Sequence, residues 1–163
     1  NQTQHRVLST IIMDADTTEL EQQARRYAEA FASLTPDRVN DLCERLAPEV
    51  HFRDPFNDLR GRESVKALLD DMFERAGKPA FDLIEVCWHQ DSRSAWLRWQ
   101  FAAQVPVIGE LRVEGSSRIR LDEAGKVIEH LDYWDSAPVY LQLPLLGGLL
   151  RRIKRKMALP PIQ

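Results

Sequence analysis

The sequence lacks the features that mark several common functional classes. It has only two cysteines, Cys43 and Cys87, and neither they nor His51 and His89 stand at the spacing of metal ligands. There is no glycine-rich phosphate loop and no Gly-x-Ser-x-Gly motif. We therefore expect no metal and no other cofactor. Two buried, reduced thiols suit a cytoplasmic location.

Long apolar runs and a strong charge imbalance are also missing. No stretch has the length of a membrane span or the pattern of a signal peptide, and residues 1–16 are expected to form a leader or disordered arm. The formal net charge is −3, yet residues 151–156 carry five cations and no acid. Removing these five charges from −3 leaves −8 on the rest of the chain. The body is therefore not a surface for nucleic acid.

Helical periodicity is present in the first half of the sequence. Apolar residues recur at helical spacing in residues 20–31, 39–46 and 65–73. Pro36 stands at a favoured early position of the second stretch, and Gly77 follows the third. These signals predict three helices.

The second half of the sequence alternates between apolar and polar residues. Alternation is typical of strands, and Asp122–Gly125 has the composition of a hairpin turn. The predicted strands are residues 81–90, 94–106, 110–121 and 126–135. With a short strand ending at Asp54, this order predicts an α+β domain over residues 17–135. We expect a cystatin-like cone in which three N-terminal helices pack on a strongly curved, mostly antiparallel sheet that encloses a pocket.

Asp54 is the first candidate for a functional side chain. It ends an apolar strand, and Pro55 restricts its backbone to extended geometry, so the direction of the carboxylate is fixed. Burial between Phe52 and Phe56 would make this carboxylate a better proton acceptor near neutral pH. Alternatively, Asp54 begins an Asx turn that leads into Asn57.

Polar residues share one face in two of the predicted strands. If both faces are concave, Arg98 and Asp132 can form a bidentate ion pair inside the cone. Otherwise they are the solvent side of the sheet. The residues concerned are Trp96, Arg98 and Gln100 in one strand and Ile128, His130, Asp132 and Trp134 in the other.

Several short motifs carry a family resemblance. They are Ala24-Arg25-Arg26-Tyr27, Asp54-Pro55-Phe56, Gly61-Arg62-Glu63, Arg120–Gly125 and Asp132-Tyr133-Trp134. In this order and spacing they resemble bacterial ketosteroid isomerase and, more broadly, the SnoaL-like, nuclear transport factor 2-like superfamily. The resemblance implies an α+β cone, usually a homodimer through the sheet, with a pocket for an apolar small molecule. Isomerases, cyclases, hydrolases and non-enzymes share this fold.

Carried over to this chain, the isomerase resemblance assigns two roles. Asp54 matches the general base that moves a proton beside a carbonyl, and Tyr27 matches the phenol that stabilises the enolate oxygen. Ser117 stands where the isomerase has a protonated Asp, and a hydroxyl is a poorer donor. Tyr27 is equally consistent with ordinary helix packing.

The sequence is similar to limonene epoxide hydrolase at other positions. Asp132 matches the Asp that activates water, and Arg98 matches its Arg partner. Gln100 replaces the acid that protonates the epoxide, and Gln has no transferable proton at neutral pH. His130 could take the place of that acid.

Together these observations predict a protein that binds an apolar, oxygenated molecule of steroid, terpenoid or polyketide type. We expect an isomerase or cyclase, with an epoxide hydrolase or a non-catalytic binding protein as alternatives. The expected catalytic residues are Asp54, Tyr27, Asp132 and Arg98. The expected ligand contacts are His130, Gln100, Trp96, Trp134, Ser117, Phe52 and Phe56.

Residues 136–163 form a separate C-terminal tail. Leu146, Leu149, Leu150 and Ile153 recur at helical spacing beside the cluster of cations. Such a segment can cap the cone, or it can lie on an anionic membrane surface. We expect it to pack on the chain's own body or on a partner subunit.

Overall fold

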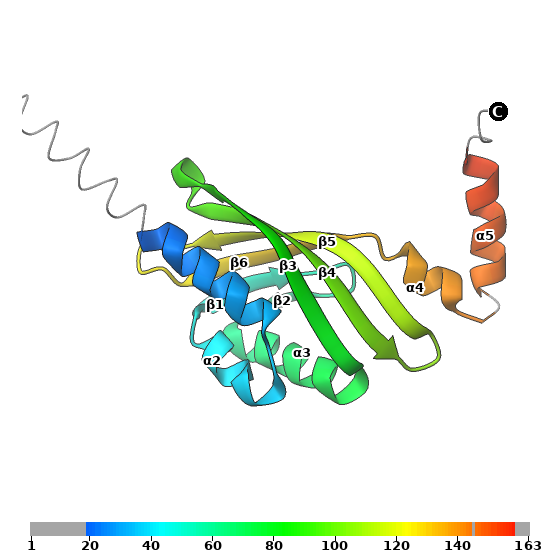
Figure 1. The fold of residues 1–163 in the computed structure, drawn as a ribbon, viewed down its shortest axis with the longest axis horizontal. Helices are drawn as coiled ribbons and strands as arrows, with labels where there is room; N and C mark the ends of the chain where they lie inside the picture. The colour runs from blue at the N-terminus through cyan, green and yellow to red at the C-terminus, as the bar shows by residue number, and fades with distance from the viewer. Residues whose placement is uncertain (1–18, 145, 159–163) are drawn as a thin grey trace, which may run out of the picture.

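A curved six-stranded sheet organises the chain, with helices on one of its faces (Figure 1). The computed structural model describes residues 19–144 and 146–158, so the predicted arm of residues 1–16 lies outside them. The first helix occupies residues 19–32 of the described chain. The other elements are η1 (Pro36–Arg38), α2 (Val39–Cys43), β1 (Leu46–Arg53), β2 (Asp58–Arg60), α3 (Arg62–Arg75), β3 (Gly77–His89), η2 (Gln90–Ser92), β4 (Ser94–Val105), β5 (Gly109–Leu121), β6 (Val127–Trp134), α4 (Ala137–Gln142) and α5 (Leu146–Met157).

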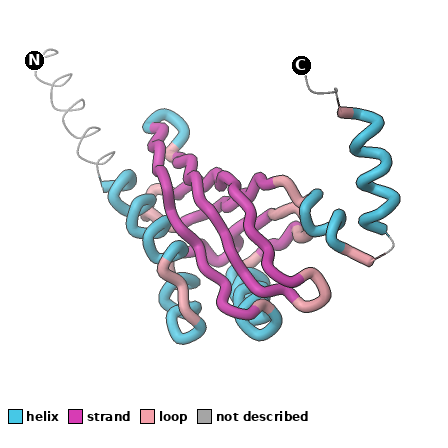
Figure 2. Tube along the Cα trace, turned by 45° about the vertical axis from the view of Figure 1, so that its right-hand side comes forward, coloured by secondary structure: helices cyan, strands magenta, loops and turns pink. Residues whose placement is uncertain are grey.

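The sheet order is β2-β1-β6-β5-β4-β3. All neighbouring strands are antiparallel except β1 and β6, which run parallel. The first helix, α2 and α3 lie on the same side of this sheet (Figures 1 and 2). The predicted α+β class, with three helices on a curved and mostly antiparallel sheet, is therefore confirmed.

The predicted end of the second helix is wrong. Helix α2 stops at Cys43, and Leu46 begins β1. Leu46 fits the helical stripe, but Val50 and Phe52 alternate as buried strand residues two positions apart. Pro48 lacks the N–H that a regular ladder needs, and the pairing with β6 is irregular between Leu46 and His51.

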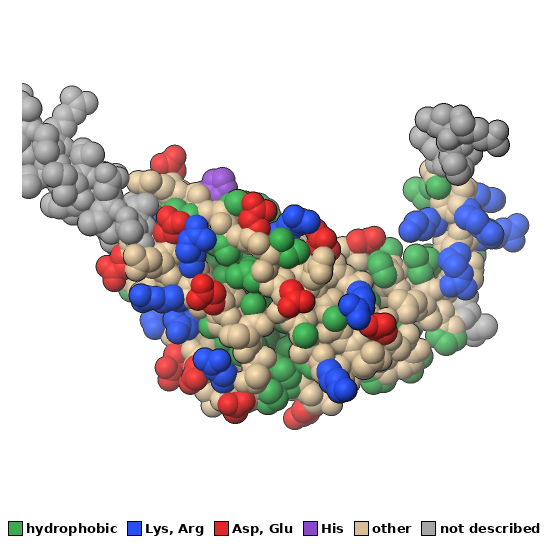
Figure 3. Space-filling view, in the orientation of Figure 1, with side chains coloured by type: hydrophobic (Ala, Val, Ile, Leu, Met, Phe, Trp, Pro, Cys, Tyr) green, Lys and Arg blue, Asp and Glu red, His purple; other side chains and the backbone are tan. Residues whose placement is uncertain are grey.

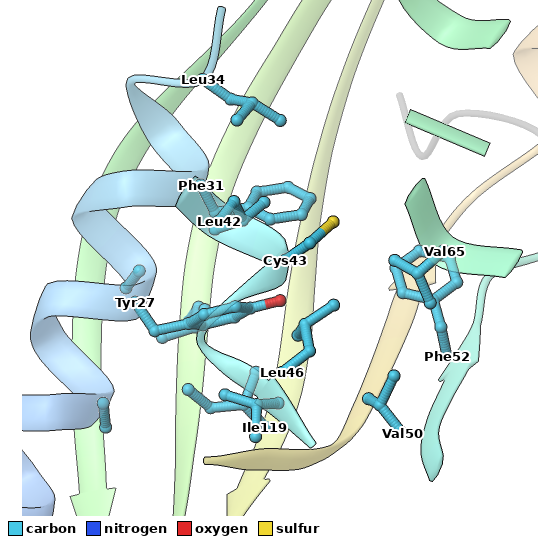
Figure 4. Close-up of a cluster of buried hydrophobic side chains, with 14 of the residues drawn as sticks. Tyr27, Phe31, Leu34, Leu42, Cys43, Leu46, Val50, Phe52, Val65 and Ile119 are labelled. Atoms are coloured by element: carbon cyan, nitrogen blue, oxygen red, sulfur yellow. The ribbon is translucent and has the colours of Figure 1, made fainter. Parts of the chain in front are cut away.

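Alternation in the strands separates an inner face, covered by helices, from an outer face. In β4 the buried Leu97 and Trp99 point toward the helices, whereas Trp96 on the outer face is exposed. Figure 4 shows Tyr27 and Phe31 of the first helix projecting into the same interior. Exclusion of this apolar surface from water is what holds the helices to the sheet.

The two thiols differ in exposure. Cys43 of α2 is buried as predicted. Cys87 is exposed, because alternation in β3 places it on the outer face, where it contacts the Glu85 side chain. The prediction of a buried thiol is therefore wrong for Cys87.

The chain leaves the sheet after β6 through α4 and ends in α5, which stands apart from the sheet (Figures 1 and 2). No helix within the described residues is both long and apolar enough to cross a membrane. The two helices contact each other, with Gly147 of α5 buried against the backbone of Leu141.

Candidate functional site

A chain of buried hydrogen bonds is centred on His130 in β6. The Nδ1 atom of His130 lies 2.7 Å from the hydroxyl oxygen of Tyr27, and its Nε2 atom lies 2.8 Å from Oδ1 of Asp132. His130 is completely buried and Tyr27 is 2% exposed. Residues two apart on a strand share a face, so β6 itself brings His130 and Asp132 together. Tyr27 reaches them from the first helix.

The hydrogen-bonding capacities of these groups determine their proton positions. A carboxylate without a proton can only accept, so the contact fits a His130 tautomer in which Nε2 carries the proton and donates a hydrogen bond to Asp132. The Nδ1 atom then accepts the hydrogen bond from Tyr27. Burial, and to a lesser extent the charges of Asp132 and Cys43, raises the pKa of Tyr27 well above its usual value. Tyr27 therefore remains a protonated donor.

A second arm of the network reaches Asp132 from β5 and β4. The Ser117 hydroxyl donates to Oδ1 of Asp132 at 2.5 Å, and the indole N–H of Trp99 donates to the Ser117 oxygen at 2.8 Å. Gly115 makes room for this indole, because a Cβ there would lie 2.5 Å from the Trp99 ring. The two arms share a single carboxylate oxygen.

Asp132 is consequently held by one oxygen and open at the other. Its Oδ1 atom accepts hydrogen bonds from His130 and Ser117, whereas Oδ2 accepts none within residues 19–144 and 146–158. The Asp132 side chain is 11% exposed, so its carboxylate is not completely closed off from solvent. A carboxylate fixed in direction with a free oxygen has the geometry of a general base.

Aromatic rings surround the network. The ring centroids of Phe31 and Phe52 lie 5.0 and 5.1 Å from that of His130. Phe81 packs edge-on against Phe31 and Trp99. The network thus combines a small number of oriented polar groups with surrounding aromatic core residues.

Asp54 adopts the alternative arrangement, the Asx turn. Its Oδ1 atom accepts hydrogen bonds from the backbone N–H groups of Phe56 and Asn57, each at 2.7 Å. Phe56 is 52% exposed, so the carboxylate is not enclosed between two Phe rings. The turn engages this carboxylate, and the expected role of Asp54 as a base stays a prediction.

The expected ion pair between Arg98 and Asp132 is wrong. Arg98 lies on the outer face of β4 with Trp96 and Gln100, whereas Asp132 points to the inner face. Arg98 instead donates to a carboxylate oxygen of Glu114 at 2.7 Å. This hydrogen bond lowers the pKa of Glu114, but both side chains are about half exposed, so the pair stabilises the fold only weakly.

The remaining predicted contacts are divided between the two faces. Phe52, Ser117 and His130 line the network, while Trp134 lies on the same face of β6 and packs edge-on against Phe56 at 5.4 Å. Tyr27 occupies the interior, but its hydroxyl bonds His130 instead of facing a ligand oxygen.

Sequence reasoning missed Trp99 and Gly115. Side chains alternate between the two faces of β4, so Trp99 lies on the face opposite to that of Arg98. A glycine within a strand often marks a close approach of another group. These two signals together could have found the arm that supports Ser117. Among the described residues there is no cluster of three or more His, Cys, Asp or Glu side chains that could hold a metal.

The curved sheet and the three covering helices form an α+β fold that solved proteins of the nuclear transport factor 2-like kind share. Residues 24–130, more than half of the chain, match the model of the SnoaL-like domain family. The chain therefore belongs to this family. A comparison with curated proteins gave no match.

Solved structures show the same fold. An epoxide hydrolase of the limonene epoxide hydrolase-like type from M. tuberculosis has a TM-score of 0.62 and 18% identity, covering 82% of this chain and 97% of its own. A putative SnoaL-like polyketide cyclase from Shewanella putrefaciens has a TM-score of 0.62 and 15% identity, covering 76% and 95%. A hypothetical protein with a ketosteroid isomerase-like fold from Catenulispora acidiphila has a TM-score of 0.60 and 15% identity, covering 72% and 90%. At these identities the likeness concerns the fold alone.

Proposed function

We propose that this protein is an isomerase or cyclase that moves a proton on a carbon beside a carbonyl group of an apolar small molecule. Asp132 is the base. The observation that carries this assignment is that His130 and Ser117 hold one oxygen of the Asp132 carboxylate and leave the other open.

The proposed reaction needs only the chain's own residues. The open oxygen of Asp132 takes a proton from the carbon beside the carbonyl, and the C–H electron pair forms an enolate. An isomerase then returns the proton to another carbon. In a cyclase the enolate carbon bonds to a second carbonyl carbon, the π electrons of that carbonyl move to its oxygen, and this oxygen takes the proton back from Asp132. His130 and Tyr27 are positioning residues, because they hold Asp132 and do not face the substrate.

The proposed substrate class rests on the apolar surroundings of the network. Phe31, Phe52 and Phe81 pack around it, and an apolar carbonyl compound of steroid, terpenoid or polyketide type suits such surroundings. The names of solved neighbours include a polyketide cyclase and a ketosteroid isomerase-like fold, which supports this class.

Epoxide hydrolysis is the second candidate. The open oxygen of Asp132 could equally activate a water molecule, and one structural neighbour is an epoxide hydrolase. We favour the first candidate because Arg98, which the hydrolase resemblance pairs with Asp132, lies on the opposite face of the sheet. Epoxide opening also needs an acid, and Gln100 on the outer face cannot supply it.

We further propose a cytoplasmic homodimer that associates through the outer face of the sheet. Ile84, Trp96 and Tyr133 are 45%, 39% and 44% exposed on this face, and the rings of Trp96 and Tyr133 lie 5.7 Å apart. A sheet face with this much exposed aromatic surface suits a protein partner. Mass measurement in solution of the protein and of its Trp96→Glu variant tests this proposal, which predicts a dimer that the variant dissociates.

The reaction itself is tested by following isotopes in a panel of apolar ketones and epoxides. Proton transfer predicts that the protein catalyses the entry of solvent deuterium at carbons beside a carbonyl. Epoxide hydrolysis instead predicts a diol that carries ¹⁸O from labelled water. Diol formation without deuterium exchange would overturn our preferred assignment in favour of the hydrolase.

A further inference from the structure

Helix α5 carries charge of one sign only. It contains five cations, whereas the rest of the chain has a net charge of −8 once these are removed from the total of −3. All five are exposed, and Figure 3 shows these blue side chains gathered on the C-terminal helix. The cations are Arg151, Arg152, Lys154, Arg155 and Lys156.

The apolar side chains of α5 form a single stripe. At about 100° per residue they fall within an arc about 100° wide. We call this set the α5 stripe: Leu146, Leu149, Leu150, Ile153 and Met157. Leu149 is 58%, Ile153 45% and Met157 81% exposed. The sequence-based expectation is that this stripe packs on the chain's own body or on a partner subunit. The body leaves these three side chains exposed, and packing on a partner subunit stays a prediction.

The contact with α4 explains why the stripe stays uncovered. Gly147 packs against the carbonyl oxygen of Leu141 so closely that a Cβ would lie 2.2 Å from it. The Arg151 guanidinium donates to the same carbonyl oxygen at 2.5 Å. Gly147 lies about 100° around the helix from the middle of the stripe. Helix α4 thus contacts the face of α5 that carries Gly147, and the α5 stripe lies on a different face of the helix.

We propose that α5 binds an anionic membrane surface and lies in its plane with the α5 stripe buried among the lipid chains. Lys154 and Lys156 flank the stripe on opposite sides, at about 80° from its middle. Both can therefore reach lipid phosphates while their alkyl stems lie along apolar surface. At about 1.5 Å per residue, α5 is roughly 18 Å long and too short to span a bilayer.

The charge pattern favours lipid over a second copy of the chain. A cation on each border of an apolar stripe suits an extended anionic surface with an apolar interior, in which both borders meet the same layer of phosphates. A protein groove would have to place an acid on both sides of an apolar floor. Cations on the remaining arc of α5 then face the headgroups and water.

Flotation of the full chain with vesicles tests the proposal. The vesicles are phosphatidylcholine alone and phosphatidylcholine with about 30 mol% phosphatidylserine, a fraction that gives an appreciable negative surface potential. One double variant, Leu149→Ser with Ile153→Ser, shortens the stripe. A second, Lys154→Gln with Lys156→Gln, removes the flanking charges. Val107→Ser is the matched control, because Val107 is 78% exposed but lies outside α5.

The proposal predicts binding to the anionic vesicles that weakens with salt. Each removed lysine should reduce partitioning roughly fivefold, so the lysine variant should lose about 25-fold. The stripe variant should also lose binding, whereas Val107→Ser should bind like the parent. All substitutions are at exposed positions, and unchanged thermal melts will show that the variants are folded.

Two results would overturn the proposal. The first is flotation that is absent, or equal for the parent and both α5 variants. The second is a stripe variant that halves the mass of the protein in solution although the parent does not float. That result would assign α5 to contact between copies of the chain.

Discussion

Replacing Tyr27 by Phe perturbs the buried network at a single atom. The substitution removes the hydroxyl and keeps the ring. The centroid of this ring lies 6.2 Å from that of Phe31 and 5.7 Å from that of His130, and both contacts remain, so no large cavity forms. A typical hydrogen bond contributes about 0.5–1.5 kcal/mol. In the variant, Nδ1 of the fully buried His130 is also left unpaired, and an unsatisfied buried group costs about 1–3 kcal/mol.

We therefore expect Tyr27→Phe to lower the free energy of unfolding by about 1–3 kcal/mol. For a chain of this size, each kcal/mol corresponds to a fall of roughly 2–4 °C in Tm. Urea denaturation followed by Trp fluorescence measures the change. Tyr140→Phe is the control, since Tyr140 is 38% exposed, and it should change stability little. A loss below about 0.5 kcal/mol for Tyr27→Phe would refute a buried hydrogen bond to His130.

Three further predictions concern alkaline stability, packing and thiol chemistry. The raised pKa of Tyr27 means that the folded state keeps a proton that the unfolded chain releases above about pH 10. The contribution of this group to stability should therefore be complete below that pH and fall as the pH rises further. Urea titrations at several pH values should show a smaller fall for Tyr27→Phe. Gly115→Ala should destabilise by roughly 1–3 kcal/mol, because its Cβ would overlap the Trp99 ring, and an unchanged melt would contradict the packing. Iodoacetamide should label the exposed Cys87 well before the buried Cys43 in peptide mass spectra. A hydrogen bond from Cys87 to Glu85 raises the pKa of the Cys87 thiol and slows its labelling, but exposure is the larger effect. Equal labelling of the two thiols would contradict their placement.

Much of the fold could be predicted because it is local. Apolar side chains recur about every 3.6 residues in the helices and every second residue in the long strands, and this period marks which side chains face the core. Gly77 and the turn at Asp122–Gly125 mark the ends of elements. The boundary at Leu46 failed because this residue fits both a helical stripe and a strand. Only the pairing of β1 with β6, a long-range contact, decides between them.

The site was harder to predict, because parity defines two faces of a strand but does not say which one is concave. Arg98 and Asp132 each lie on a polar face, yet those faces point to opposite sides of the sheet. The link between Tyr27 and His130 spans 103 positions and leaves no local pattern. Asp54 offered a plausible base from local chemistry alone, and only the three-dimensional turn shows that its carboxylate is engaged.

The central claim is that Asp132, and not Asp54, is the base. The most direct test compares kcat/KM of the Asp132→Asn and Asp54→Asn variants for deuterium exchange into the best ketone of the panel. Asn keeps one oxygen that can accept the hydrogen bonds now made to Oδ1 of either carboxylate, so both variants should fold. We predict that Asp132→Asn loses roughly 10²–10⁴-fold in kcat/KM, whereas Asp54→Asn stays within about fivefold of the parent. Full activity in Asp132→Asn, with the loss confined to Asp54→Asn, would contradict this assignment and restore Asp54 as the base.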